Sequence, residues 1–219
     1  DNERLICRKK EKSYFFVGGN VKTMSEIKFS ASGQMNLDSK FGSFLYNFIK
    51  EEKIKKVLET GTWNGYGSTR ILYEALKDEE NPFLISFETD PLWVKETKKL
   101  YSPVDWVNIV HGSIIKKEEF FTSGLDNIRS GWLQEDYERY DTCMFYDIKD
   151  LDIELALLDS SEFGGFAEFK RIEKKCQYVV LDDTLKHKKT RKYCLEKYIC
   201  IEDHPNDRNG WSIFELKEK

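Results

Sequence analysis

The chain has 219 residues, of which 40% are hydrophobic and 34% are charged, and its formal net charge is -4. This balance is typical of one globular domain with a sizeable core, and the negative charge argues against a general nucleic-acid binder. No stretch approaches the roughly eighteen apolar residues of a membrane span, and the opening DNERLICRKKEK lacks the apolar core of a secretory signal. We therefore expect a cytoplasmic protein that binds neither membrane nor nucleic acid.

The cysteines point to the same compartment. They are odd in number and widely spaced, and no C-x-x-C pair occurs among them. This pattern favours reduced thiols over a disulfide framework or a zinc site. The five are Cys7, Cys143, Cys176, Cys194 and Cys200.

The first part of the chain divides into an arm and the start of a domain. Residues 1–33 mix basic and turn-forming residues, and we interpret them as an N-terminal arm or lid ahead of a domain that spans 34–219. In 37–54, LDSKFGSFLYNFIKEEKI, apolar residues at helical spacing predict a helix with Asp38 as its N-cap.

Beyond this helix, short apolar runs alternate with amphipathic helical segments. The alternation predicts a Rossmann-like α/β fold, a doubly wound and mostly parallel sheet with helices on both faces. The connection 204–210 is too short for a crossover helix, so the last strand should run antiparallel. The longer segment 115–152 should hold helices and a surface loop. The seven predicted strands are 55–60, 83–88, 104–110, 153–159, 178–183, 198–203 and 211–217, and helices are predicted within 67–80, 91–101, 161–175 and 191–198.

Acidic residues end four of these strands. They are Glu59, Glu88, Asp159 and the pair Asp182 and Asp183. One such acid commonly caps the following helix, but parallel strands bring their carboxyl ends to one edge of the sheet, where α/β proteins bind ligands. The set therefore indicates a site.

The stretch VLETGTWNGYGST, residues 57–69, follows the first strand with three glycines. Their spacing is not the G-x-G-x-x-G of dinucleotide sites, because Trp63 stands where a second glycine would be needed. A strand that ends in Glu59 suits a cationic ligand better than a pyrophosphate. S-adenosylmethionine, with its sulfonium and amino groups, is such a ligand.

This stretch resembles motif I, E-x-G-x-x-x-G, of class I S-adenosylmethionine-dependent methyltransferases. The aromatic residue at the middle position is similar to that of the catechol-type, divalent-metal-dependent O-methyltransferases. MNLDSKFGSFL, LISFETDP, VHGS, LLDSSE and VVLDD resemble further segments of that group. The resemblance implies methylation of a hydroxyl on a small molecule or glycan, and it leaves a homo-oligomer open. The cofactor-binding residues that it implies are Met35, Asn36, Glu59, Gly61, Thr62, Trp63, Gly65, Ser68, Glu88, Thr89, Gly112, Ser113 and Asp159.

The same resemblance makes Asp159, Asp182 and Asp183 the ligands of Mg²⁺ or another divalent cation, which prefers carboxylate oxygens. Two departures affect the chemistry. Asp183 stands where the group often has asparagine, and Glu162 occurs in DSSE where those enzymes commonly carry a lysine base. We therefore predict His187 as the base beside Asp159, since the pKa of histidine suits proton transfer near neutrality. A metal-independent O- or N-methyltransferase and a non-catalytic, cofactor-binding partner subunit remain the alternatives.

Overall fold

The computed structural model describes residues 35–123, 130–161 and 163–218. The predicted arm, 1–33, and Glu162 lie outside the described residues. Among the described helices, none combines the length and the apolar character that a membrane crossing requires.

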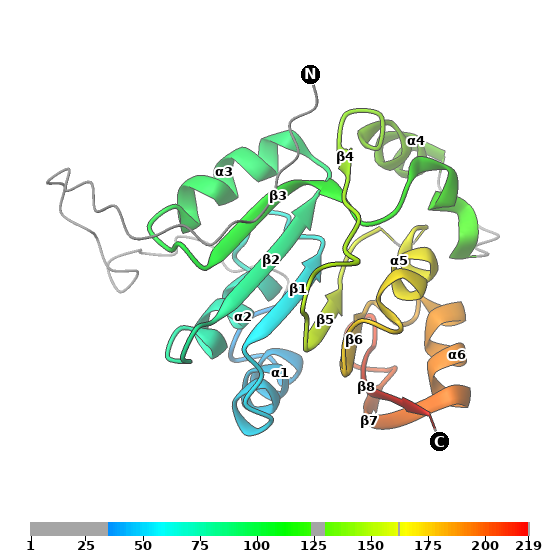
Figure 1. Ribbon diagram of the computed structural model, residues 1–219. Helices are drawn as coiled ribbons and strands as arrows, with labels where there is room; N and C mark the ends of the chain where they lie inside the picture. Colours follow the sequence, from blue (N-terminus) through cyan, green and yellow to red (C-terminus); the bar gives the residue numbers. More distant parts are fainter. Residues whose placement is uncertain (1–34, 124–129, 162, 219) are drawn as a thin grey trace, which may run out of the picture.

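The centre of the fold is an eight-stranded sheet with the order β4-β3-β2-β1-β5-β6-β8-β7 (Figure 1). Neighbouring strands from β4 to β6 are parallel, whereas β8 runs antiparallel to both β6 and β7. The strands are β1 (Lys56–Thr60), β2 (Phe83–Glu88), β3 (Val107–Ser113), β4 (Met144–Phe145), β5 (Leu155–Leu158), β6 (Tyr178–Asp182), β7 (Tyr198–His204) and β8 (Trp211–Glu218). The helices are α1 (Lys40–Glu51), α2 (Ser68–Leu76), α3 (Pro91–Tyr101), the 3-10 helix η2 (Lys117–Ser123), α4 (Ser130–Arg139), α5 (Gly165–Ile172) and α6 (Lys188–Lys197).

The predicted fold class and all seven predicted strands are confirmed. The sequence analysis missed the eighth strand, β4, which has only two residues and pairs with the end of β3 at Gly112 and Ser113. Two exposed residues are too few for a periodic pattern, so this edge strand leaves no signal of its own. The first helix begins one residue later than predicted, because the Ser39 hydroxyl, and not Asp38, accepts the capping bond from the Gly42 N–H.

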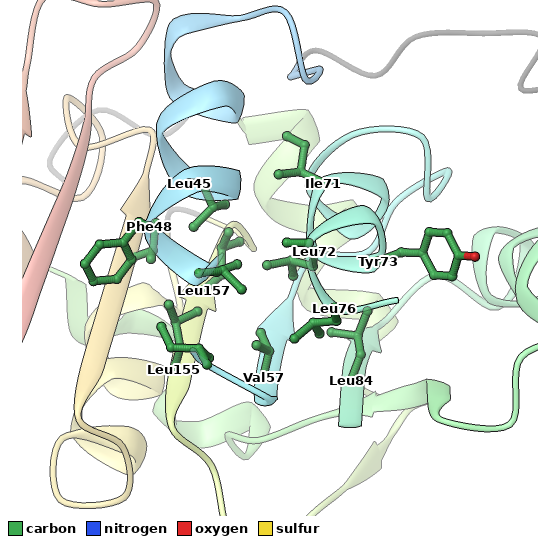
Figure 2. Close-up of a cluster of buried hydrophobic side chains, with 14 of the residues drawn as sticks. Leu45, Phe48, Val57, Ile71, Leu72, Tyr73, Leu76, Leu84, Leu155 and Leu157 are labelled. Atoms are coloured by element: carbon green, nitrogen blue, oxygen red, sulfur yellow. The ribbon is translucent and has the colours of Figure 1, made fainter. Parts of the chain in front are cut away.

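Helices cover both faces of the sheet, as the strand sequences require. Alternate residues of one strand point to opposite faces, so Val57 packs in one apolar cluster and Leu58 in another. Figure 2 shows part of the first cluster, where Leu45 of α1 and Leu72 of α2 meet Leu157 of β5. The second cluster joins the other face to α5 and α6.

The strand order places a topological switch at β1 and β5. From β1 the chain builds β2, β3 and β4 on one side, and it then returns to add β5 and β6 on the other. Loops that leave β1 and β5 at their carboxyl ends therefore diverge, and ligands of doubly wound folds bind in the crevice between them.

Candidate active site

A cavity of about 620 Å³ lies at the carboxyl edge of the sheet, over the switch point. Its size falls within the roughly 300–1,000 Å³ of small-molecule sites. Segments that follow β1, β2, β3, β5 and β6 contribute to its wall, as do α4, α5 and the turn between β7 and β8. The predicted site residues that line it are Met35, Gly61, Thr62, Trp63, Ser68, Glu88, Thr89, Gly112, Ser113, Asp159, Asp183 and His187.

Gly61 allows the chain to turn out of β1 into the cavity wall. Its N–H donates to the Phe87 carbonyl at 2.9 Å, and its φ is +92°, a region that favours glycine. A Cβ atom here would lie 2.1 Å from the Asp159 carbonyl oxygen, so the loops after β1 and β5 touch at this residue. The glycine is required by both the backbone conformation and the close approach.

Glu88, at the end of β2, fixes the next part of this turn. Its Oε2 accepts the Trp63 N–H at 2.7 Å and its Oε1 accepts the Asp90 N–H at 2.8 Å. Burial raises the pKa of Glu88 above its ordinary value, against the effect of these two backbone donors. The Trp63 ring, 43% exposed, packs edge-on against Trp93 at the cavity wall, with 5.8 Å between ring centroids.

Glu59 lies beneath the cavity and not in its lining. The carboxylate is fully buried, and its Oε2 accepts hydrogen bonds from the Ser86 hydroxyl at 2.5 Å and the Thr69 hydroxyl at 2.7 Å. Burial raises its pKa. Through these bonds the Glu59 side chain links β1 to β2 and to α2. This position supports a structural role for Glu59, which holds the turn that follows β1.

Asn36 and Gly65 also lie outside the cavity lining. The Asn36 Oδ1 accepts the Ser39 N–H at 2.9 Å, which places this side chain at the start of α1. Gly65 packs against α3, where its carbonyl accepts the Tyr101 hydroxyl at 2.6 Å. Neither residue contacts the cavity, but both stabilise segments that form its wall.

The three aspartates predicted to bind a metal lie together, but an arginine that the sequence analysis did not consider lies among them. The Arg208 guanidinium donates to both carboxylate oxygens of Asp182, and the same nitrogen is 3.7 Å from Asp183 Oδ1. Asp159 accepts the Ser68 hydroxyl at 3.2 Å. Burial, and then the neighbouring charge of Asp182, raise the pKa of Asp159 well above its ordinary range.

This donor set does not fit Mg²⁺. Both oxygens of Asp182 face a guanidinium, which would repel a divalent cation at the same place. In the part of the chain that the structure describes, no three His, Cys, Asp or Glu side chains are arranged to hold a metal ion. Asp182 is thus an ion-pair partner of Arg208, and the assignment of Asp159, Asp182 and Asp183 as metal ligands stays a prediction that this geometry does not favour.

His187 lies in the cavity wall at the start of α6. Its ring packs against Gly165, where a Cβ atom would come within 2.2 Å of Nδ1. Burial lowers the pKa of His187 to about 4, so the imidazole is neutral at physiological pH. A base whose conjugate acid is this strong accepts protons poorly near neutrality, which weakens the predicted role.

Glu168, on α5, is a buried titratable group of the cavity that the sequence analysis missed. It is 2% exposed, and its Oε2 accepts the hydroxyl hydrogens of Thr60 at 3.0 Å and Ser160 at 2.5 Å. Burial raises the pKa of Glu168 to about 7. In the sequence, Glu168 is a glutamate between phenylalanines of a predicted helix. Such a position is equally compatible with the exposed face of the helix.

The remaining wall comes from α4, which the sequence analysis placed only as an unspecified helix. Arg139 bridges Asp90 at 3.3 Å and Asp136 at 2.9 Å, and the Asp136 carboxylate also accepts the Ser161 hydroxyl at 2.9 Å. These bonds join α4 to the loops after β2 and β5. They hold α4 at the cavity wall, where Asp136 and Arg139 contribute to the lining.

No protein-family model and no curated protein matches the sequence. Solved structures do match the fold, and the three described next each have a TM-score of 0.55. An SAH-bound methyltransferase, PaMTH1 from Podospora anserina, is 14% identical over 81% of this chain and 78% of its own. An O-methyltransferase from Bacillus cereus in complex with SAH (S-adenosylhomocysteine) is 12% identical over 84% of each chain. The O-methyltransferase TomG from Streptomyces achromogenes, involved in tomaymycin synthesis and in complex with SAM (S-adenosylmethionine), is 12% identical over 83% and 81%. The chain thus has the Rossmann-like fold of S-adenosylmethionine-dependent O-methyltransferases.

Proposed function

We propose that this protein transfers a methyl group from S-adenosylmethionine to a hydroxyl oxygen of a small molecule or glycan. The observation that carries the proposal is the cavity at the switch point, with the Gly61 turn and the buried Glu88 carboxylate on its β1 and β2 side. The methyltransferases that share the fold, three of which hold SAM or SAH, support the same reading.

The cofactor would lie over β1 and β2. A carboxylate has acceptor positions for both hydroxyls of a ribose, and Glu88 ends β2 with its two oxygens held by backbone N–H groups. The Gly61 turn would bound the methionine portion, and Gly112 and Ser113, which follow along the edge at β3, would bound the adenine. A positively charged sulfonium suits a wall that is rich in carboxyl groups.

The acceptor would lie over β5 and β6, and Glu168 would take its proton. When bound, the cofactor supplies an electrophilic methyl group and leaves as neutral SAH. The Glu168 carboxylate would accept the hydroxyl proton as the acceptor oxygen gains the methyl group. A base that is half ionised near neutral pH meets the usual requirement for general base catalysis.

Two alternatives differ in what they require. Assistance by Mg²⁺, which the sequence resemblance implies, has less support because Arg208 is bound to Asp182. A non-catalytic partner subunit would bind SAH but form no product with any acceptor, and the proton-accepting position of Glu168 favours an enzyme over it.

The proposal is tested by calorimetric titration of the full chain with SAH. We expect one site per chain with micromolar affinity, because the product SAH keeps the ribose and adenine of the cofactor and would make the same contacts. SAM consumption with a panel of phenolic, sugar and polyketide hydroxyls then tests turnover. Absence of heat at millimolar SAH would contradict the proposal.

Replacing Glu88 with alanine should weaken SAH binding by about 1–3 kcal/mol, or roughly 5- to 150-fold. The change removes the ribose acceptor and leaves the N–H groups of Trp63 and Asp90 without their partner. The measurement is the same titration, and the matched control is Glu96→Ala on exposed α3, which should leave the affinity unchanged. Equal affinities for the two variants would show that Glu88 does not bind the cofactor.

A further inference from the structure

Arg208 lies where the sequence pattern leads one to expect a metal ion. Its guanidinium bonds both oxygens of Asp182, whose side chain is 1% exposed, and it is 3.7 Å from Asp183 Oδ1. The latter oxygen is buried and has no hydrogen-bond partner within the described residues. Lys186 Nζ lies 3.4 Å from the other oxygen, Asp183 Oδ2, so two side-chain cations face Asp183, whereas Arg208 alone bonds both oxygens of Asp182 among the described ion pairs.

The fold holds Arg208 in this position through the turn between β7 and β8. The tip of the turn is bound to the loop after β6, because the Thr184 N–H donates to the Gly210 carbonyl at 3.0 Å and the Leu185 N–H donates to the Asn209 carbonyl at 2.9 Å. Arg208 has a φ of +56°, uncommon for a residue with a side chain. This local conformation and the two backbone bonds direct the guanidinium toward Asp182.

The charge arrangement makes the arginine and a divalent cation mutually exclusive. A guanidinium is always protonated and forms strong, directional bonds to carboxylates, so it satisfies Asp182 without any ion. A divalent cation needs the same oxygens and would lie within a few ångströms of a fixed positive charge. Either the arginine leaves or the ion stays out.

We propose that Arg208 is the resident cation of this acidic cluster, and that the protein methylates its acceptor without a divalent metal. The statement about metal-free methylation rests on the proposed function. The statement that Arg208 occupies the acidic cluster does not. Arg208 acts through the aspartates as a positioning residue: it offsets the charge of Asp182 and keeps this wall of the cavity closed to metal ions.

Binding of Mn²⁺, which prefers carboxylate ligands and is directly measurable by electron paramagnetic resonance, tests the proposal on the full chain. Titrations are run with and without SAH for the unmodified protein, Arg208→Ala, Asp182→Asn and the double variant. Arg191→Ala is the matched control, because Arg191 also bonds both oxygens of an aspartate, Asp203, but lies outside the cavity lining.

We expect Arg208→Ala to bind one Mn²⁺ per chain at least ten times more tightly than the unmodified protein, and the double variant to lose this site. The unmodified protein and Arg191→Ala should show no site that depends on Asp182. The proposal would be overturned if the unmodified chain bound one Mn²⁺ and the Asp182→Asn change abolished that binding. This comparison does not need Arg208→Ala to fold. A folded Arg208→Ala variant with no gain would overturn it too. Failure of the proposed function would instead appear as lack of SAH binding in every sample, with the Mn²⁺ results unaffected.

Discussion

Replacing Gly61 with alanine should lower the free energy of unfolding by about 3–5 kcal/mol, one of the largest effects of adding a single methyl group to this chain. The added Cβ would lie 2.1 Å from the Asp159 carbonyl oxygen and 2.9 Å from the Ser160 N atom, and φ at this position is +92°. Both obstacles are backbone atoms at the centre of the sheet edge, so no side-chain rotation relieves them. The backbone must move, and because Gly61 and Asp159 both line the cavity, SAH binding should weaken as well.

Thermal unfolding followed by circular dichroism measures the effect, and a chain of this size should lose on the order of 10 °C. Gly164→Ala is the matched control. Its Cβ would approach the Ile115 Cδ1 atom at 2.8 Å, but that atom ends a flexible side chain, and φ is −89° at the start of α5. The control should change stability by less than about 1 kcal/mol. A Gly61→Ala variant that unfolds at the normal temperature would show that the loops after β1 and β5 do not touch.

Much of the fold could be predicted because its determinants are local in the sequence. Short apolar runs and amphipathic helices alternate, and a brief connection between the last two strands fixes their antiparallel pairing. Gly61 and Glu88 could be located because strand ends in a doubly wound sheet share one edge. Asn36, predicted at the cofactor, forms a hydrogen bond at the start of α1, since its short side chain is close to Ser39 in sequence, and its contact with the cofactor stays a prediction.

The rest of the site depends on contacts between distant segments. Arg208 reaches Asp182 only because the β7–β8 turn is bound to the loop after β6, and no periodic pattern records that contact. The burial of Glu168 likewise could not be predicted from the sequence. A glutamate on an amphipathic helix is expected to face solvent, and burial becomes evident only when α5 packs over the end of β1 and brings Thr60 to its carboxylate.

Replacing Glu168 with glutamine should abolish most of the activity and, at alkaline pH, make the protein more stable. If Glu168 takes the acceptor proton, its loss should lower kcat by about 10²- to 10⁴-fold, while SAH affinity is retained. In the unmodified protein, kcat/KM should rise with pH and level off above the pKa of about 7, because only the carboxylate form accepts a proton. Initial rates across pH 5–9, with an acceptor from the hydroxyl panel, measure both effects, and Glu96→Gln is the control.

The stability effect follows from the direction of the same pKa change and needs no acceptor. In the unfolded chain the carboxyl has its ordinary pKa of 4.5, whereas burial raises the folded value to about 7. Between these values the folded state holds a proton that the unfolded state has lost, so the free energy of unfolding falls as pH rises. The stabilising contribution is complete below pH 4.5 and is lost through pH 7, and the difference corresponds to about 3 kcal/mol.

Glutamine removes this loss while keeping an oxygen that can accept the hydroxyl hydrogens of Thr60 and Ser160. Denaturant unfolding of the two proteins should therefore give equal stabilities near pH 4.5 and an advantage for Glu168→Gln that grows to about 3 kcal/mol at pH 8. Taking the difference between the proteins at each pH cancels every other titrating group. A difference that does not change with pH would show that the pKa of Glu168 is not raised by folding, and a carboxylate with an ordinary pKa would be too weak a base for the proposed step. A buried group that makes the fold less stable when it ionises is thus the expected signature of a carboxylate kept for proton transfer.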